Sequence, residues 1–217
     1  MSTLKRKEKE KEQRRKLIID SAQTLFFSKH YDEITIDEIA KKSQLAKGTL
    51  YLYFKSKEAL YSAVALRGAN IMNAMFKDAV GRHHSGLEKA FAVGEAYYEF
   101  YKRHSQYFCM LEEAEKLPVA TSGDVNAAEL IKLSQENLKI VLYAVCNGIK
   151  DGSIKPDLNP IQTSIFLVQT TRAMILLPPG LDIFLRQAGV DKDATVEFTL
   201  QALYRSLENI KSKCDEA

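Results

Sequence analysis

Helical periodicity is the sequence feature that most constrains what this chain can fold into. From Gln13 onward, apolar residues recur every three or four positions in one segment after another, which is the pattern of amphipathic helices. Alternating β-branched runs joined by tight turns, which predict strands, are nearly absent, and Asp151-Gly152 lies between two helical patterns. We therefore predict an all-α protein.

Caps, glycines and prolines predict where each helix begins and ends. The first helix runs from Gln13 to near Ser28. Thr35 and Glu38 form a capping box, in which each side chain accepts the other residue's backbone N–H, and this box begins a short helix that ends near Lys42. The further predicted helices cover about residues 46–54, 57–82, 86–104, 106–117, 125–152, 160–177, 181–188 and 192–213.

Charge is distributed unevenly along the chain. Residues 1–57 carry 14 Lys and Arg against 8 Asp and Glu, whereas residues 58–217 carry 17 against 20. A basic end on a mildly acidic body is expected where that end meets a polyanion, although a solvated charged helix gives the same asymmetry. We predict a flexible basic arm over residues 1–12, a small domain over 13–57 and a larger helical domain over 58–217.

Composition excludes several classes of protein. With 217 residues, of which 46% are hydrophobic, the chain can form a core without disulfides or structural metals. Its three cysteines have no CxxC spacing, which disfavours a disulfide framework or zinc site and fits a reducing cytoplasm. No apolar segment follows the basic N-terminus as in a signal peptide, and Arg172 and Pro178-Pro179 interrupt the longest weakly charged stretch. We expect a soluble cytoplasmic protein with no membrane partner.

The two short helices at 36–42 and 46–54 have the spacing of a helix-turn-helix motif. Ala40 is the small residue that lets the helices approach, and a residue tolerant of the left-handed conformation, usually glycine, belongs in the turn. Gln44 occupies that place, at a cost of about 1 kcal/mol. The apolar residues that would close the small core are Ile36, Ile39, Leu45, Leu50 and Phe54.

The second short helix carries the groups that a recognition helix needs. Lys47 can donate to guanine or to a phosphate, and Gly48 lets the backbone approach DNA closely. The four bulky residues 51–54 cannot all point into the core from one helix, which favours the exposure of some of them. Each one taken alone could instead be an ordinary core residue. Two lysines add charge beside the positive end of the next helix. The candidate DNA-binding residues are Thr35, Gln44, Lys47, Gly48, Thr49, Tyr51, Tyr53, Lys55 and Lys57.

A specific run of residues spans about residues 13–60, comprising Arg15 to Ile19, Ala22, Leu25, Phe26, Tyr31, Asp32, Thr35, Ile39, Ala40, Lys47 to Tyr51, Tyr53, Phe54 and Ser56 to Glu58. This run resembles the DNA-binding domain of the TetR family of prokaryotic transcriptional regulators. The chain has His30-Tyr31 where the family usually has Gly-Tyr, and Ser43-Gln44-Leu45-Ala46 where it usually has Ala-Gly-Val-Ser. The second departure removes a turn glycine and a hydroxyl cap, which bears on operator geometry rather than on the fold.

The resemblance implies a homodimer in which the last two long helices of each subunit form a four-helix bundle. The residues themselves supply an apolar stripe in the last helix, at four- and three-residue spacing. The stripe could instead serve only the internal core. It consists of Val196, Leu200, Leu203, Leu207 and Ile210.

The resemblance also implies a ligand site among the central helices. Tyr, Phe and Met dominate the candidate lining without a cluster of cationic side chains, so we expect a small apolar or aromatic inducer. Ordinary core packing is the alternative for each residue, whereas polar side chains such as Arg172 in an apolar helix need partners, from a ligand or the neighbouring subunit. The candidates are Tyr97, Tyr101, Phe108, Tyr143, Cys146, Phe166, Gln169, Thr170 and Met174.

Enzymatic function has little support. The sequence has no GxxxxGK[ST], GxSxG, HExxH or GxGxxG motif. His83 and His84 are adjacent rather than four residues apart, and the acidic residues at 112, 113 and 115 are typical of a solvated face. We expect no catalytic residues, cofactor or metal.

The leading hypothesis is a repressor that binds a palindromic double-stranded DNA operator and that a ligand releases. The alternative within the same class is a ligand-independent activator or architectural DNA-binding protein. A membrane-surface or scaffold protein could use the basic segment on anionic lipid, but Glu8, Glu10 and Glu12 interrupt that segment and no large apolar face accompanies it.

Overall fold

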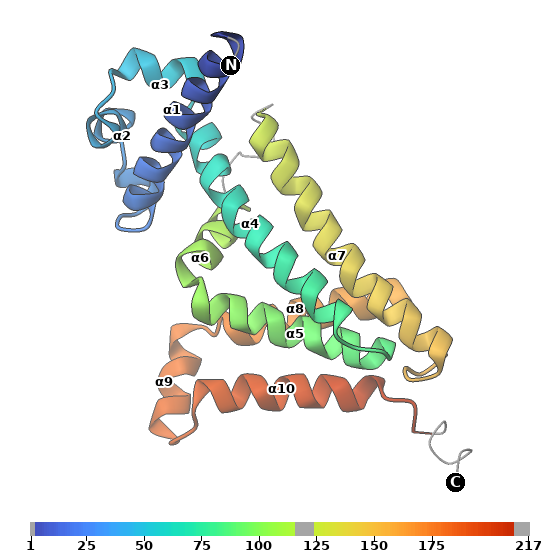
Figure 1. Cartoon of the computed structure of the whole chain (residues 1–217). Coiled ribbons are helices and arrows are strands. Elements are labelled where there is room, and N and C mark those ends of the chain that lie inside the picture. Colours follow the sequence, from blue (N-terminus) through green and yellow to red (C-terminus); the bar gives the residue numbers. More distant parts are fainter. Residues whose placement is uncertain (1–2, 116–123, 211–217) are drawn as a thin grey trace. The chain divides into compact units, whose positions relative to one another are not determined.

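The computed structural model describes residues 3–115 and 124–210, and every regular element in these residues is a helix (Figure 1). The all-α prediction is confirmed. The elements are α1 (Thr3–Phe26), the 3-10 helix η1 (Tyr31–Glu33), α2 (Ile36–Ser43), α3 (Lys47–Tyr53), α4 (Lys57–Gly81), α5 (Gly86–Arg103), α6 (Ser105–Ala114), α7 (Val125–Asp151), α8 (Pro160–Ile175), α9 (Pro179–Gln187) and α10 (Lys192–Leu207).

Helix α1 begins at Thr3 rather than near Gln13, so the segment predicted as a flexible arm is helical from its third residue. The residue types explain this start, because Lys, Arg, Glu and Gln are strong helix formers. Arg6 and Glu10, one turn apart, also form an ion pair with 3.0 Å between Nε and Oε1. Sequence reasoning placed the start at Gln13, one turn before the first residue of the apolar stripe, Leu17, and gave too little weight to the polar residues before it.

Helix α10 ends at Leu207, whereas periodicity predicted a helix to about residue 213, of which the last positions lie outside the described residues. Beyond Leu207 the backbone pairs with the loop after α7. The Asn209 N–H donates to the Ser153 carbonyl at 3.0 Å, and the Lys155 N–H donates to the Leu207 carbonyl at 3.0 Å. This pairing uses the groups that a longer helix would need.

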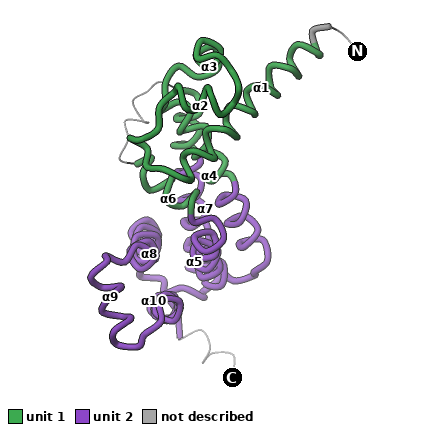
Figure 2. The backbone as a smooth tube through the Cα atoms, turned by 90° about the vertical axis from the view of Figure 1, so that its left-hand side faces the viewer, with its two compact units in different colours: residues 1–70, 106–132 green, residues 71–105, 133–217 purple. Residues whose placement is uncertain are grey.

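The chain forms two compact units (Figure 2). Unit 1 comprises residues 1–70 and 106–132, and unit 2 comprises residues 71–105 and 133–217. The predicted division after residue 57 differs from these units, because the first part of α4 packs in unit 1. Within that unit Tyr61 donates to the Met110 carbonyl at 3.1 Å, and Arg67 and Tyr107 both donate to Gln23 Oε1, at 2.7 and 2.8 Å.

In unit 2, α5 approaches the end of α7 so closely that only glycine fits at the contact. A Cβ atom at Gly86 would lie 1.9 Å from the backbone nitrogen of Gly148. The last residue of α7 also binds the start of α5, since Asp151 Oδ2 accepts from the Gly86 N–H at 2.8 Å. Helix α10 packs on α5 and α8. Among the described helices, none combines the length and apolar character that a bilayer crossing requires.

Candidate DNA-binding site

The turn between α2 and α3 contains the left-handed residue that a helix-turn-helix motif requires. Gln44 has φ 55° and ψ 35°, and among the described residues other than glycine it alone has positive φ. The Gln44 N–H donates to the Lys41 carbonyl at 3.2 Å, and the Leu45 N–H donates to the Ala40 carbonyl at 3.0 Å, which closes the end of α2. The predicted conformation of Gln44 is confirmed.

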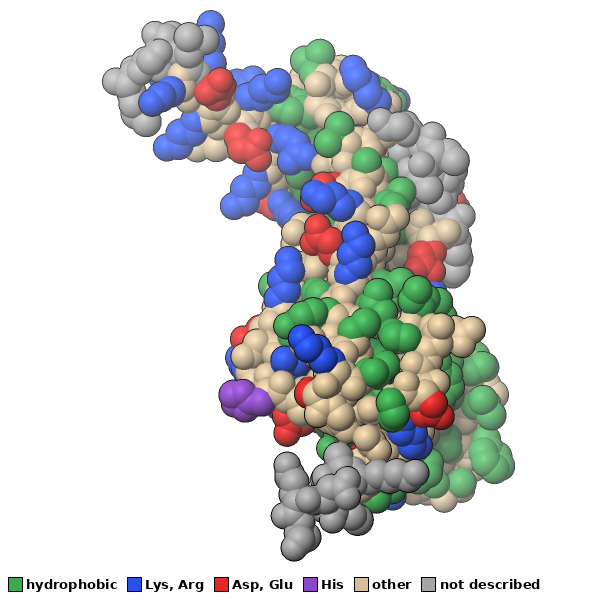
Figure 3. Space-filling model, turned by 90° about the vertical axis from the view of Figure 1, so that its right-hand side faces the viewer, with side chains coloured by type: hydrophobic (Ala, Val, Ile, Leu, Met, Phe, Trp, Pro, Cys, Tyr) green, Lys and Arg blue, Asp and Glu red, His purple; other side chains and the backbone are tan. Residues whose placement is uncertain are grey.

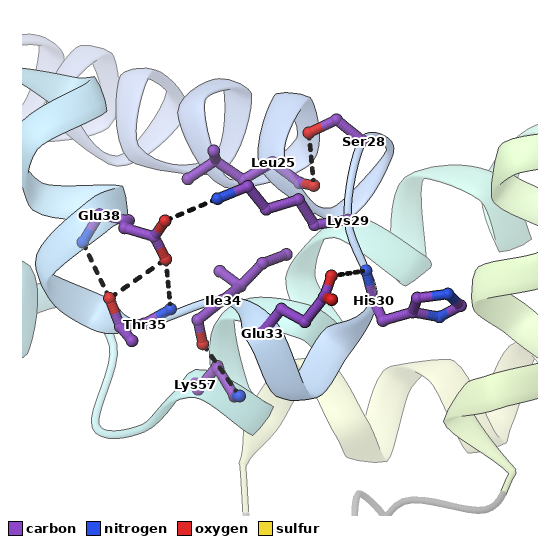
Figure 4. A network of polar contacts seen from close by, with 9 residues as sticks. All are labelled: Leu25, Ser28, Lys29, His30, Glu33, Ile34, Thr35, Glu38 and Lys57. Carbon is purple, nitrogen blue, oxygen red and sulfur yellow. Dashed lines mark hydrogen bonds and ion pairs between the residues drawn. The ribbon is translucent and has the colours of Figure 1, made fainter.

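The predicted capping box begins α2 and is also bound to the segment that follows α1 (Figure 4). Thr35 Oγ1 accepts from the Glu38 N–H at 3.2 Å, and Glu38 Oε2 accepts from the Thr35 N–H at 3.0 Å. Lys29 Nζ lies 2.7 Å from Glu38 Oε1. The hydrogen bond from Lys29, with the backbone bond from Thr35, lowers the pKa of Glu38 to about 2. Glu38 therefore fixes the start of α2 by two independent contacts.

Lys57 is bound within unit 1 rather than presented to solvent. Its Nζ donates to the carbonyls of Tyr31 and Ile34, at 2.8 and 3.0 Å, and lies 3.9 Å from the Tyr31 ring centroid. The Tyr31 hydroxyl in turn donates to Glu58 Oε1 at 2.7 Å, and burial together with this bond raises the pKa of Tyr31. Lys57 thus closes the turn around η1, and its role as a phosphate contact stays a prediction.

Helix α3 divides its bulky side chains between the core and solvent. Leu50 and Phe54 are buried, whereas Tyr51 is 41% and Leu52 77% exposed. At the start of the helix, Lys47 Nζ lies 2.8 Å from Asp37 Oδ2, and both side chains are largely exposed. Tyr51 and the charged Lys47 are therefore both available to a partner.

Gly48 is not required by packing within the chain. A Cβ atom placed on it would meet nothing within 4 Å. Glycine inside a helix lowers stability by roughly 0.5–1 kcal/mol relative to alanine. Because Gly48 has no side chain, nothing protrudes from the exposed surface of α3 at this position, as a close approach to a DNA backbone would require.

Positive charge extends from this motif onto α1. Figure 3 shows Lys and Arg side chains along the projecting start of α1 and the adjoining surface of unit 1. Arg15 fixes this helix to the motif, with its guanidinium carbon 5.4 Å from the Phe54 ring centroid. The same side chain donates to Asn126 Oδ1 at 2.9 Å.

A family model described as "Bacterial regulatory proteins, tetR family" matches residues 18–64, which include η1, α2 and α3. Residues 18–64 thus form a DNA-binding domain of the TetR family of transcriptional regulators. Members of this family bind DNA, so the chain is a DNA-binding transcriptional regulator.

Several transcriptional regulators match this chain over most of its length. The HTH-type transcriptional regulator YhgD of Bacillus subtilis is 27% identical over 170 residues, covering 75% of this chain and 82% of that protein. The HTH-type transcriptional repressor KstR2 of Mycolicibacterium smegmatis is 26% identical over 179 residues, covering 81% and 85%. The solved structure of FadR from Bacillus subtilis, a complex with stearoyl-CoA, has a TM-score of 0.64 at 20% identity and covers 87% of this chain and 96% of that one. That likeness establishes the fold.

The predicted DNA-binding residues of this chain all lie in unit 1, but they differ in exposure. Thr49 and Tyr53 are half-buried, Thr35 uses its hydroxyl in the capping box, and Lys57 is bound to carbonyls. Besides Thr35, which is exposed but uses its hydroxyl in the cap, the exposed candidates are Gln44, Lys47, Gly48, Tyr51 and Lys55.

The predicted ligand-binding residues do not all meet at one site. Phe108 is 1% exposed in the core of unit 1, whereas the others belong to unit 2. A periodic pattern cannot show which core a buried aromatic residue joins, and here α6 places Phe108 in unit 1. Tyr97 packs on Phe76, Val93 and Val141. The other unit 2 candidates divide into the half-buried Tyr101, Thr170 and Met174 and the exposed Tyr143, Cys146, Phe166 and Gln169.

The apolar stripe of α10 lies largely within the core of unit 2. Val196, Leu200, Leu203 and Leu207 are at most 7% exposed, while Ile210 is 66% exposed. For these four buried residues, the internal-core alternative is the one that agrees with the structure, because α10 packs them against its own chain. The exposed apolar residues of α8 and α10 are different ones, namely Ile161, Ile165, Phe166 and Phe198.

Sequence reasoning missed a buried amide pair in unit 2. Asn73 Nδ2 donates to Asn137 Oδ1 at 2.8 Å, and both residues are 6% exposed. Asn137 Nδ2 is buried and has no hydrogen-bond partner. The available signal was a polar residue in an otherwise apolar helical face, the same signal that singled out Gln169, Thr170 and Arg172 in α8. Asp37, the ion-pair partner of Lys47, was also missed, because no spacing rule links the two positions.

Proposed function

We propose that this TetR-family regulator is a homodimeric repressor that binds a palindromic operator and dissociates when a small apolar or aromatic ligand binds unit 2. The observation that carries the DNA-binding part is the geometry around Gln44. The left-handed turn and the capped α2 hold α3 with Lys47, Gly48 and Tyr51 exposed. A recognition helix uses its N-terminal residues to contact base edges in the major groove.

The dimer is supported by apolar surface on α8 and α10. Phe198 is 74% exposed, and Ile161, Ile165 and Phe166 are between 46% and 60% exposed. Large apolar side chains gathered on two neighbouring helices are typical of protein–protein contacts. A second copy of the chain would cover them by a two-fold contact of the same surface on both subunits. Two motifs related in this way read half-sites about 34–36 Å apart, or a multiple of that spacing.

The ligand is supported by the buried amide of Asn137. Its Nδ2 atom donates to no acceptor, and leaving a buried donor unsatisfied costs about 1–3 kcal/mol. The cluster of Phe76, Val93 and Val141 is apolar, so a ligand for this region would be largely apolar with one hydrogen-bond acceptor. FadR of Bacillus subtilis was solved with stearoyl-CoA, whose acyl chain and thioester carbonyl fit this description, so long-chain acyl thioesters are the first class to test.

The test uses promoter DNA flanking the coding region of this protein. We expect the full chain to bind one duplex specifically, and a reporter from that promoter to rise when the gene is deleted. A reporter that falls would assign an activator, and DNA binding that no acyl thioester or aromatic compound changes would favour a ligand-independent protein.

Reciprocity tests the coupling between the two sites. A ligand that weakens operator binding must itself bind more weakly when the operator is saturating, by the same factor, typically about 1–3 kcal/mol of coupling. Calorimetric titration of the ligand with and without operator measures this factor. Identical ligand affinity in both titrations would exclude ligand-induced release.

A further inference from the structure

The first part of α1 projects from unit 1 and carries one face made of cations. Lys7, Lys11 and Arg14 follow each other at four- and three-residue spacing, so their side chains lie on one side of the helix. All three are exposed. Glu8 and Glu12 share a different side of the helix, and Glu10 is paired with Arg6.

This cationic face continues the side of α1 that is buried against the helix-turn-helix motif. Ile18 and Ala22 extend the same spacing, and both are fully buried in unit 1. Arg15 holds the helix to Phe54, the residue after α3. Figures 1 and 2 both show the start of α1 leaving unit 1 at the end where α3 lies. The face of Lys7, Lys11 and Arg14 is therefore turned to the side on which α2 and α3 lie.

We propose that this face of α1 is a second DNA-contacting surface, which binds phosphates of the duplex beside the base pairs that α3 reads. The argument rests on the proposed operator binding by α3. A duplex docked on α3 continues past the edge of unit 1, as α1 does, and presents a row of negative charges to the three cations. Residues 5–16 extend about 18 Å at 1.5 Å per residue, enough to follow several phosphates.

These contacts are to phosphates, so they raise affinity for every sequence and do not select among bases. They also make binding more dependent on salt, because each neutralised phosphate releases condensed counterions. The logarithm of the association constant falls with the logarithm of salt concentration by about 0.9 for each contact. Three contacts therefore steepen the slope by about 2.7 for each subunit engaged.

The experiment compares two triple variants of the full-length protein. The test variant carries Lys7→Gln, Lys11→Gln and Arg14→Gln, and the matched control carries Lys5→Gln, Lys9→Gln and Lys16→Gln on the opposite side of α1. Both lose the same charge and keep a good helix former at each position. Circular dichroism verifies equal helix content. Fluorescence anisotropy then measures binding to a random-sequence duplex of about 30 base pairs, long enough to contact both recognition helices of a dimer.

We expect the test variant to bind the duplex more weakly and with a shallower salt slope, by about 2.7 per engaged subunit, between about 50 and 200 mM salt. The control should keep most of the wild-type slope. Equal slopes for the two triple variants would overturn the proposal, since the effect would then be one of net charge. A salt slope unchanged from the wild type in the test variant would also overturn the proposal. So would a test variant that keeps its DNA binding but loses binding to anionic phosphatidylserine vesicles. A wild-type protein that binds neither this duplex nor any promoter duplex would instead refute the proposed function itself.

Discussion

Lys47 is held by Asp37 before any DNA is present, and this pair determines how the lysine meets a base. The hydrogen bond and charge of Asp37 raise the pKa of Lys47, so the ammonium stays charged. When Lys47 binds DNA, either this ion pair breaks, or the Asp37 carboxylate stays close and repels the phosphates. An exposed pair of this kind contributes little to stability. Its effect therefore falls mainly on DNA binding.

We predict that Lys47→Ala weakens operator binding by about 1–3 kcal/mol, concentrated at one base-pair position if Lys47 reads a base. Asp37→Asn should raise affinity for random DNA, because it removes a negative charge near the phosphates and frees the ammonium. Anisotropy on an operator and a scrambled duplex measures both. A loss equal across all sequences would show that Lys47 contacts only a phosphate.

Glu38 predicts a pH effect confined to one contact. Its pKa falls from an ordinary 4.5 to about 2 in the folded chain, so its contribution to stability is present above about 4.5 and lost as pH falls towards 2. The free energy of unfolding of the wild type should thus exceed that of Glu38→Gln at neutral pH, and the gap should close in acid. Urea denaturation at a series of pH values measures this difference in the free energy of unfolding. In a Lys29→Met background, which lacks the main cause of the pKa shift, the effect of Glu38→Gln should be smaller. A gap independent of pH would contradict the assignment.

At the scale of elements, helices α4 and α7 are joined in unit 2 by the bond between Asn73 and Asn137. Removing one amide leaves the other without its hydrogen-bond partner in an apolar core, whereas removing both leaves no such group. We predict that Asn73→Leu or Asn137→Leu alone lowers the free energy of unfolding by about 1–3 kcal/mol, and that the double variant recovers most of the loss. Urea denaturation of the four proteins completes the cycle. Additive losses would show that the two amides act independently.

At the scale of the whole molecule, the two sides of α10 have different tasks in the proposed dimer. Leu203 is buried within the chain, so Leu203→Ala should lower the free energy of unfolding by about 2–5 kcal/mol. Phe166→Glu with Phe198→Glu places charges on exposed positions and should yield monomers of unchanged helix content. Sedimentation and circular dichroism separate the two effects. Dimers of full affinity from the double variant would place the interface elsewhere.

The sequence by itself determined the all-α class, the capping box at Thr35 and the left-handed turn at Gln44, although it misplaced the start of α1 and the end of α10. Each of these depends on residues within about four positions of one another, and such local preferences are legible in a single chain. The family-specific run at residues 47–58 belongs to the same class, because its spacing is that of one short helix and the cap that follows it.

Tertiary structure decided what those local signals left open. Periodicity showed that α10 has an apolar side but not that its own chain buries it, and it could not assign Phe108 to unit 1. The sequence around Lys57 did not show that its ammonium binds the carbonyls of Tyr31 and Ile34 in the folded chain. The physical reason is common to all three. A side chain's final partner is chosen by packing between segments far apart in sequence, and spacing along one helix carries no information about the surface it meets.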